Sequence, residues 1–337
     1  MTQNYLQDNL LKQILEHYPK KALAVAQLAE LLSVGKDGIY RRIRNDTLLS
    51  PDEIYFLAKR FKISLDEIIF GHSNKIIFSY NLFDQKINSF KDYLEQIHQQ
   101  IATVSKLPKV LIYYASQELA PFFYYFIPEL AKFKLFIYGL TAWELDFLQD
   151  RKFTFDLLAP SEELLLAEIV ELYSNHDTKD LWTQGILDNT LNQLEYIALI
   201  GRFEKPGDAL LLCDKILELL NHIKKMAEVG GKFAIKSSPD ASRGNFDLYY
   251  NELINTGNTI LAVTGAGKYL YTTFINPNFL QTADPNLGDK MEQWFNATIQ
   301  HSTSISRHSG KSRNLFFNRL EKKVSATRQR IELIVAE

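Results

Sequence analysis

Positively charged side chains gather in the short stretch from Lys36 to Arg44, and their types and spacing point to a particular chemistry. One lysine and three arginines stand there against a single aspartate, so the stretch carries a formal charge of +3. Ammonium and guanidinium groups bind phosphates, and a guanidinium can also bind the edge of a guanine base. The stretch therefore predicts a surface that contacts duplex DNA.

Two helical patterns around a tight turn would position these cations. Apolar residues recur at helical spacing along residues 25–32, and Ile39 and Ile43 form the inward pair of the charged helix. The pattern breaks between them, where Gly35 can adopt a positive φ without a Cβ penalty. This is the spacing of a helix-turn-helix, whose second helix enters the major groove of DNA.

The flanking sequence predicts three further helices. An apolar stripe from Leu6 to Leu15 suits a first helix that ends near Tyr18. The segments Ser50–Glu53 and Ser64–Glu67 each place a serine three residues before a glutamate, which is the pattern of a capping box. We therefore expect a fourth helix through Phe61, a short fifth helix after it, and an all-α domain over residues 1–72.

Residues 5–71 resemble the lambda-repressor-like domains of the Cro/repressor and xenobiotic-response-element family. The resemblance rests on LAELLSV, IYRRIRND and LSPDEIYFLAKRFKISLDEII, which follow the family's five-helix order. Ser33 departs from the pattern, because the family often has glycine at this position. The resemblance implies a helix-turn-helix transcriptional regulator that acts by binding double-stranded DNA.

The family's DNA contacts carry over to matching positions only. They imply a phosphate contact for Gln27 and phosphate contacts for Arg42 and Arg44. The base contacts are assigned to Lys36, Asp37, Tyr40 and Arg41 of the third helix. The predicted DNA-binding set is Gln27, Lys36, Asp37, Gly38, Tyr40, Arg41, Arg42 and Arg44. The alternative is a helix-turn-helix kept for protein contact, with solvated arginines. Residues 1–72 carry a net charge of only +1, so a dimer or a second basic element would help binding.

The composition of the whole chain narrows the class of protein. The 337 residues are 46% hydrophobic with a net charge of −2, which argues against a protein that coats DNA without sequence preference. The single cysteine, Cys213, and the lack of a signal-peptide pattern favour a cytoplasmic protein. Prolines and charges interrupt the apolar region Leu119–Trp143, so we expect no membrane partner.

Residues 73–337 read as an α/β body. Short apolar runs predict strands at Lys75–Tyr80, Lys109–Tyr114 and Phe133–Tyr138, with helices at Phe90–Val104 and Phe122–Leu130. Further strands are expected at Phe246–Tyr250, Thr259–Val263 and Tyr269–Phe274. The predicted fold class is therefore α+β and multidomain, with a five-helix amino-terminal domain followed by this body.

The segment from about 160 to 231 reads as almost wholly helical, with Ser161 as a helix cap. Apolar stripes along residues 187–198 and 210–220 predict a helical hairpin, whose second stripe suits either the protein's own core or the seam of a dimer. A basic helix is expected at about 311–334. It could dock on its own domain while offering charge to DNA or to a partner, or carry a solvated basic face.

Motifs of enzymes are incomplete. The sequence TGAGK at residues 264–268 lacks the first glycine and the hydroxyl of a phosphate-binding loop, because Ala262 and Tyr269 stand in their places. Residues 249–306 resemble, in layout, the catalytically empty phospholipase D-like domains of some regulators, but His308 and Lys311 do not have the spacing of that catalytic pair. We predict no catalytic residue, metal or cofactor.

The sequence thus predicts a DNA-binding transcriptional regulator, acting as a homodimer, whose body serves oligomerisation and binds a small-molecule effector. Two alternatives stay open. One is an enzyme of unrecognised type with an appended DNA-targeting domain, and the other is a protein-interaction scaffold.

Overall fold

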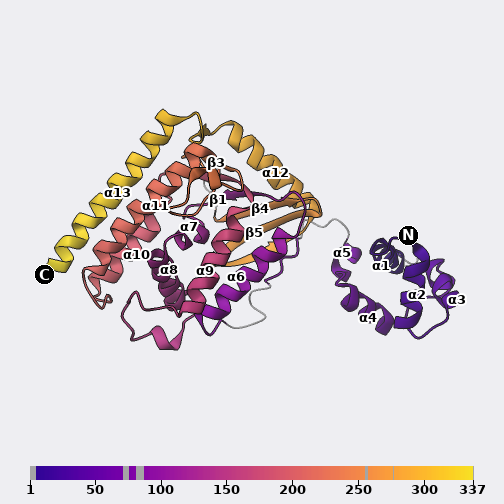
Figure 1. Cartoon of the computed structure of the whole chain (residues 1–337). Coiled ribbons are helices and arrows are strands. Elements are labelled where there is room, and N and C mark those ends of the chain that lie inside the picture. The colour runs from indigo at the N-terminus through magenta and orange to yellow at the C-terminus, as the bar shows by residue number, and fades with distance from the viewer. Residues whose placement is uncertain (1–4, 71–75, 81–86, 255–256, 276, 337) are drawn as a thin grey trace. The chain divides into compact units, whose positions relative to one another are not determined.

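The structure is a computed structural model that describes residues 5–70, 76–80, 87–254, 257–275 and 277–336. The chain divides into two compact units, Met1–Ile76 and Ile77–Glu337, which we call the amino-terminal unit and the body. The boundary lies a few residues after the one expected at residue 72. Figure 1 gives the element labels used below.

The amino-terminal unit consists of short helices, as predicted. Its helices are α1 (Tyr5–Glu16), α2 (Lys21–Leu31), α3 (Lys36–Ile43), α4 (Pro51–Phe61) and α5 (Leu65–Phe70). Each has an apolar stripe, and Leu10, Ile14, Leu28 and Leu57 meet in a common core at 0% exposure. Ser50 and Glu53 form the expected capping box at the start of α4.

A buried glutamine links α1 to the segment after α3. The Gln7 amide nitrogen donates to the carbonyl oxygens of Arg42 at 2.7 Å and Thr47 at 3.1 Å, and to the Asn45 side chain at 3.0 Å. The Leu49 backbone N–H donates to the Gln7 side-chain oxygen at 2.6 Å. These bonds satisfy backbone groups that the chain reversal leaves without helical partners, and they fix where α3 ends.

The body is built on a mixed seven-stranded sheet in the order β6-β5-β4-β1-β2-β3-β7. Strands β1 (Leu111–Ala115), β2 (Asp177–Trp182) and β3 (Phe246–Tyr250) run parallel at its centre. An antiparallel meander, β4 (Thr259–Thr264), β5 (Gly267–Ile275) and β6 (Asn278–Thr282), extends one side, and β7 (Thr303–Ser304) pairs with β3 on the other. The strands predicted near β1, β3, β4 and β5 are confirmed.

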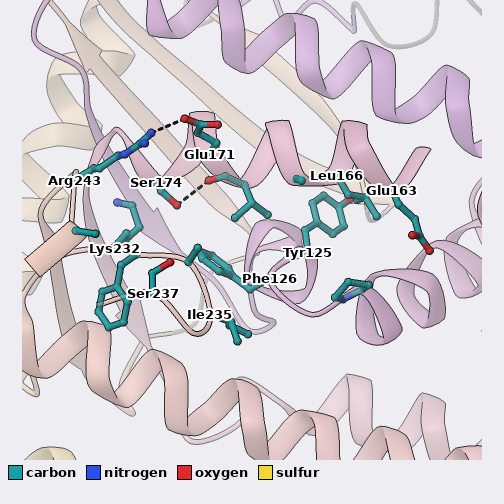
Figure 2. A pocket seen from close by; sticks show the side chains of 16 residues that line it. Tyr125, Phe126, Glu163, Leu166, Glu171, Ser174, Lys232, Ile235, Ser237 and Arg243 are labelled. Atoms are coloured by element: carbon teal, nitrogen blue, oxygen red, sulfur yellow. Dashed lines mark hydrogen bonds and ion pairs between the residues drawn. The ribbon is translucent and has the colours of Figure 1, made fainter. Parts of the chain in front are cut away.

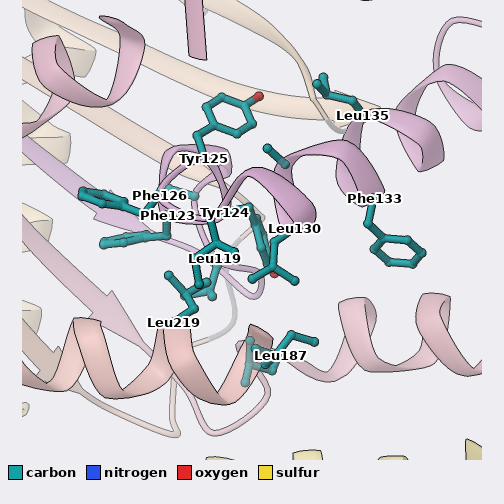
Figure 3. Packing of buried hydrophobic residues seen from close by; sticks show 14 of the residues in the cluster. Leu119, Phe123, Tyr124, Tyr125, Phe126, Leu130, Phe133, Leu135, Leu187 and Leu219 are labelled. Atoms are coloured by element: carbon teal, nitrogen blue, oxygen red, sulfur yellow. The ribbon is translucent and has the colours of Figure 1, made fainter. Parts of the chain in front are cut away.

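Most helices of the body pack into one large apolar core on a single face of the sheet. They are α6 (Phe90–Ser105), α7 (Pro121–Tyr125), α8 (Pro128–Thr141), α9 (Pro160–Ser174), α10 (Asp188–Leu199), α11 (Asp208–Val229) and α13 (Gly310–Ala336). Figure 3 shows part of this core, where Phe123, Tyr124 and Leu130 lie close to Leu187 and Leu219. Helix α12 (Pro285–Gln300) instead places Phe295 in a smaller cluster with Tyr113, Leu181 and Leu261. Successive side chains of β1 and β2 therefore point alternately into the large core and into this smaller cluster, which lie on opposite faces of the sheet.

Two predictions within the body are wrong. The expected strand Phe133–Tyr138 is part of α8, whose residues from Leu130 to Gly139 are all buried. A helix buried on all sides has no polar stripe, so its short apolar run resembles a buried strand. The segment read as almost wholly helical contains β2, which lies at the sheet's centre although two of its residues are aspartates.

Smaller corrections concern the ends of elements. Residues 76–80 form only an isolated bridge, through Ser79 and Gln281, and Lys75 lies outside the described residues. The N-cap of α9 is Ala159 rather than Ser161, and its N–H donates to the Glu162 carboxylate at 2.7 Å.

The predicted helical hairpin is present as α10 and α11, and α13 packs along both helices. Its stripes face the body's own core, since Leu194, Cys213 and Leu220 are each 0% exposed. This favours the core interpretation of the second stripe over a dimer seam. Within the part of the chain that the structure describes, no helix combines the length and apolar character needed to cross a membrane.

Candidate nucleic-acid interface

The turn between α2 and α3 is tight and carries its strain at one residue. Ser33 has a φ of 52°, in the left-handed region, and its N–H donates to the Glu30 carbonyl at 3.2 Å. The Val34 N–H donates to Ala29 at 3.0 Å, which ends α2. Gly35 has a φ of −67° as the N-cap of α3, so the positive φ expected there belongs to Ser33 instead.

Helix α3 exposes one polar face. Its residues Lys36, Asp37 and Arg41 are exposed, as is Arg44 directly after the helix, while Tyr40 is half-buried. Positions separated by four residues share a side of a helix, so these five residues form one continuous face. We call Lys36, Asp37, Tyr40, Arg41 and Arg44 the α3 face. Ile39 holds the opposite side of the helix in the core at 1% exposure.

Arg42 points away from this face. Its guanidinium forms an ion pair with Glu53 of α4, with 2.7 Å between Nη2 and Oε1, and it also donates to the Gly38 carbonyl at 3.3 Å. The two side chains are only 14% and 19% exposed. The structure therefore gives Arg42 a partner inside the amino-terminal unit, and it fixes the position of α3 against α4.

The remaining predicted residues take different places. Gln27 is half-buried on α2, and Arg44 pairs with Asp46 at 2.9 Å while its side chain stays 63% exposed. Such an exposed pair contributes little to stability, so Arg44 can exchange Asp46 for another anion. A Cβ added at Gly38 would meet only ordinary contacts, the nearest with Arg42 at 3.6 Å.

The basic side of α13 is largely paired within the body. Its cations form ion pairs that join it to α10 and α11, namely Lys323 with Asp188, Arg330 with Glu195, Arg328 with Asp214 and Arg313 with Glu228. The Arg330 guanidinium holds both oxygens of Glu195 at 2.8–2.9 Å. The expected docking of this helix on its own domain is thus present, but most of its cations take part in it, whereas both sequence interpretations left these cations exposed.

A polar cleft of about 790 Å³ lies where the parallel strands end, lined by residues that follow β1, β2 and β3, such as Glu118, Thr183 and Glu252. Carboxyl ends of parallel strands are the usual place for ligands in α/β sheets. Beside the cleft, buried Lys134 contacts the Glu118 carboxylate and also donates to Gln193 at 2.8 Å and Thr190 at 3.3 Å.

Protein groups satisfy this buried lysine. Burial lowers the pKa of Lys134, and the Glu118 carboxylate opposes that shift. The three acceptors match the three protons of an ammonium, so Lys134 is a structural link from α8 to Glu118 and to Thr190 and Gln193 of α10. This link was not predictable from the sequence, because Lys134 lies in the run that resembled a strand.

No family model, curated protein or solved structure significantly matches the chain.

Proposed function

We propose that the chain is a sequence-specific DNA-binding regulator and that the α3 face reads the operator. The observation that carries this proposal is the division of the cations around α3. Arg42 is held inside the amino-terminal unit, whereas Lys36, Arg41 and Arg44 stay exposed on one side of a short, anchored helix. An eight-residue helix with such a face fits the width of a major groove.

Four residues of the α3 face have a role in this proposal. The Arg41 guanidinium binds a guanine edge through two hydrogen bonds, and the Asp37 carboxylate accepts a hydrogen bond from the amino group of a cytosine. Lys36, Arg44 and Gln27 contact phosphates, which fix the register of the helix on DNA. Arg42 is a positioning residue, since its ion pair with Glu53 sets the angle of α3.

The charge of the amino-terminal domain argues for two copies on one operator. A net charge of +1 over residues 1–72 supports only modest binding by a single copy. We therefore propose a homodimer, whose half-sites would lie about 10 base pairs apart, or a multiple of this spacing. The body would supply the contacts between the copies.

Selection of bound sequences from a random DNA pool tests the proposal with the full chain. We expect an enriched, two-fold symmetric site. Arg41→Ala should weaken binding to that site about tenfold or more at fixed salt. Arg60→Ala removes another exposed arginine, from α4, and serves as the matched control. Failure to enrich any sequence, or equal losses in the two variants, would overturn the assignment of α3 and favour a protein-interaction scaffold.

A further inference from the structure

A second hollow of the body, of about 450 Å³, opens between α7, α9 and the segment 231–243 that precedes β3. Its walls are mainly apolar and include the rings of Tyr125, Phe126 and Phe233 together with Leu166 and Ile235. This volume is within the range of pockets that hold small ligands, about 300–1,000 Å³. The hollow therefore offers an apolar compartment for a small molecule.

The polar residues of this hollow are unevenly placed. Lys232, Ser237 and Arg243 gather at one end, whereas Tyr125 and Leu166 lie toward the other (Figure 2). Glu163 stands at the far end and forms an ion pair with Lys132 at 2.5 Å. Arg243 pairs with Glu171 at 2.7 Å, and both of these side chains are more than half exposed. One end of the compartment is thus polar and built around a buried lysine.

Lys232 is an unusual group for such a wall because it is 0% exposed. Its ammonium contacts the His176 carbonyl and donates to Thr178 at 3.2 Å and to the Asn245 carbonyl at 3.3 Å. It also lies 5.2 Å from the centre of the Tyr173 ring. Burying an ammonium costs several kcal/mol unless a counter-ion is near.

The counter-ion of Lys232 is poorly held. Asp180 on β2 is 0% exposed, and its carboxylate oxygens make no hydrogen bond of good geometry, although the side chains of Thr178 and Trp182 lie close enough to lower its pKa. Burial raises the pKa of Asp180 to about 7 against the lowering effect of Lys232, and burial lowers the pKa of Lys232 to about 8. The other titratable groups around the pair are Asp177, Asp247, His176, Tyr114 and Tyr173.

We propose that this hollow binds a small apolar monocarboxylate, with its hydrocarbon part between the ring-lined walls and its carboxylate at the end formed by Lys232 and Arg243. A second carboxylate near Lys232 competes with Asp180 for the same positive charge. The three acceptors that hold the Lys232 ammonium are neutral, so the ligand carboxylate replaces one of them, and its negative charge favours the protonated form of Asp180. An organic cation in the same place is repelled, and a neutral analogue gains only the apolar contacts.

Binding at this hollow does not depend on the proposed DNA recognition, so the two can fail separately. Calorimetric titration of the full chain with octanoate, octanamide and octylamine measures binding at the hollow. We expect octanoate to bind at least about tenfold more tightly than either analogue. Near neutral pH, the binding enthalpy of octanoate should differ between two buffers with different ionisation enthalpies, in the direction that corresponds to proton uptake by the protein. Failure of octanoate to bind, equal affinity for octanamide, or binding without proton uptake would overturn the proposal.

Variants locate the ligand. Ala167 of α9 and Ala234 of the segment before β3 line the hollow and are exposed, so Ala167→Trp and Ala234→Trp should fill it from two different elements. Each should weaken octanoate binding about tenfold or more, while thermal unfolding shows that the variant is folded. Ala326→Trp, on the exposed side of α13, is the matched control and should bind as the wild type does. Unchanged octanoate affinity in both folded variants would place the ligand elsewhere and refute this site.

Discussion

Replacing Arg42 by methionine separates the positioning role of this residue from the contact role of its neighbour Arg41. The change keeps an unbranched apolar stem but removes the guanidinium and with it the ion pair with Glu53. A hydrogen bond to a charged group contributes about 1.5–3 kcal/mol, and loss of a fully buried pair costs about 3–5 kcal/mol. Because both partners are 14–19% exposed, we expect a loss of about 2 kcal/mol in the stability of the amino-terminal unit.

Hydrogen–deuterium exchange of the full chain measures this loss where it occurs. A loss of about 2 kcal/mol corresponds to about 30-fold faster exchange of the amides in α3 and α4. Exchange in the body should not change, because the two units are separate compact units. Arg41→Met is the control, since Arg41 is exposed and should alter exchange by less than about threefold. Equal effects of the two variants would refute the positioning role of Arg42.

Two further changes test the fold. Ser33→Gly should stabilise the amino-terminal unit by about 0.5 kcal/mol, because relief of the left-handed backbone outweighs the added freedom of the unfolded chain. Slower amide hydrogen exchange in α2 and α3 would show this gain, and faster exchange would contradict it. The second change is the double variant Asp180→Asn/Lys232→Met. The free energy of unfolding of the wild type, measured relative to that of this variant, should fall as pH rises from about 4 to 7 and should recover above about 8. The sign follows because folded Asp180 keeps a proton that the unfolded chain releases near pH 3.8, whereas folded Lys232 releases one that the unfolded chain keeps until about pH 10.5. Urea unfolding across this pH range measures the difference, and a constant difference would argue against the pair.

The amino-terminal unit was largely predictable because its signals are local. Helical spacing placed Ile39 in the core and Lys36 and Arg41 on the surface, and the capping box located the start of α4. The ion pair of Arg42 was not predictable, because it depends on how α3 and α4 pack. Nothing in the spacing of residues 36–44 distinguishes Arg42 from its neighbours.

The body was harder to predict because its pattern depends on distant contacts. Strand β2 carries aspartates that a buried strand normally lacks. The charge of Lys232, which lies 52 residues later in the sequence, partly offsets the cost of burying Asp180. The sequence of α8 shows no helical alternation of apolar and polar residues, because other elements cover all sides of this helix. The hollow near Lys232 likewise joins α7 and α9 to the segment 231–243, which no local motif connects.

The docking of α13 has a consequence for the order of folding. Its ion pairs Lys323–Asp188 and Arg330–Glu195 each join residues 135 positions apart, whereas the Gln7–Leu49 bond of the amino-terminal unit spans 42. Rates of folding fall as contacts become more distant along the chain. On the ribosome, the amino-terminal unit can therefore fold early, while the large core of the body waits for Phe316, Leu320 and Val324 to be synthesised. During that interval the amino-terminal unit would already expose a folded α3 face while the apolar residues of the body are still unpacked. Such exposed apolar surface is prone to aggregation, and chaperones protect it.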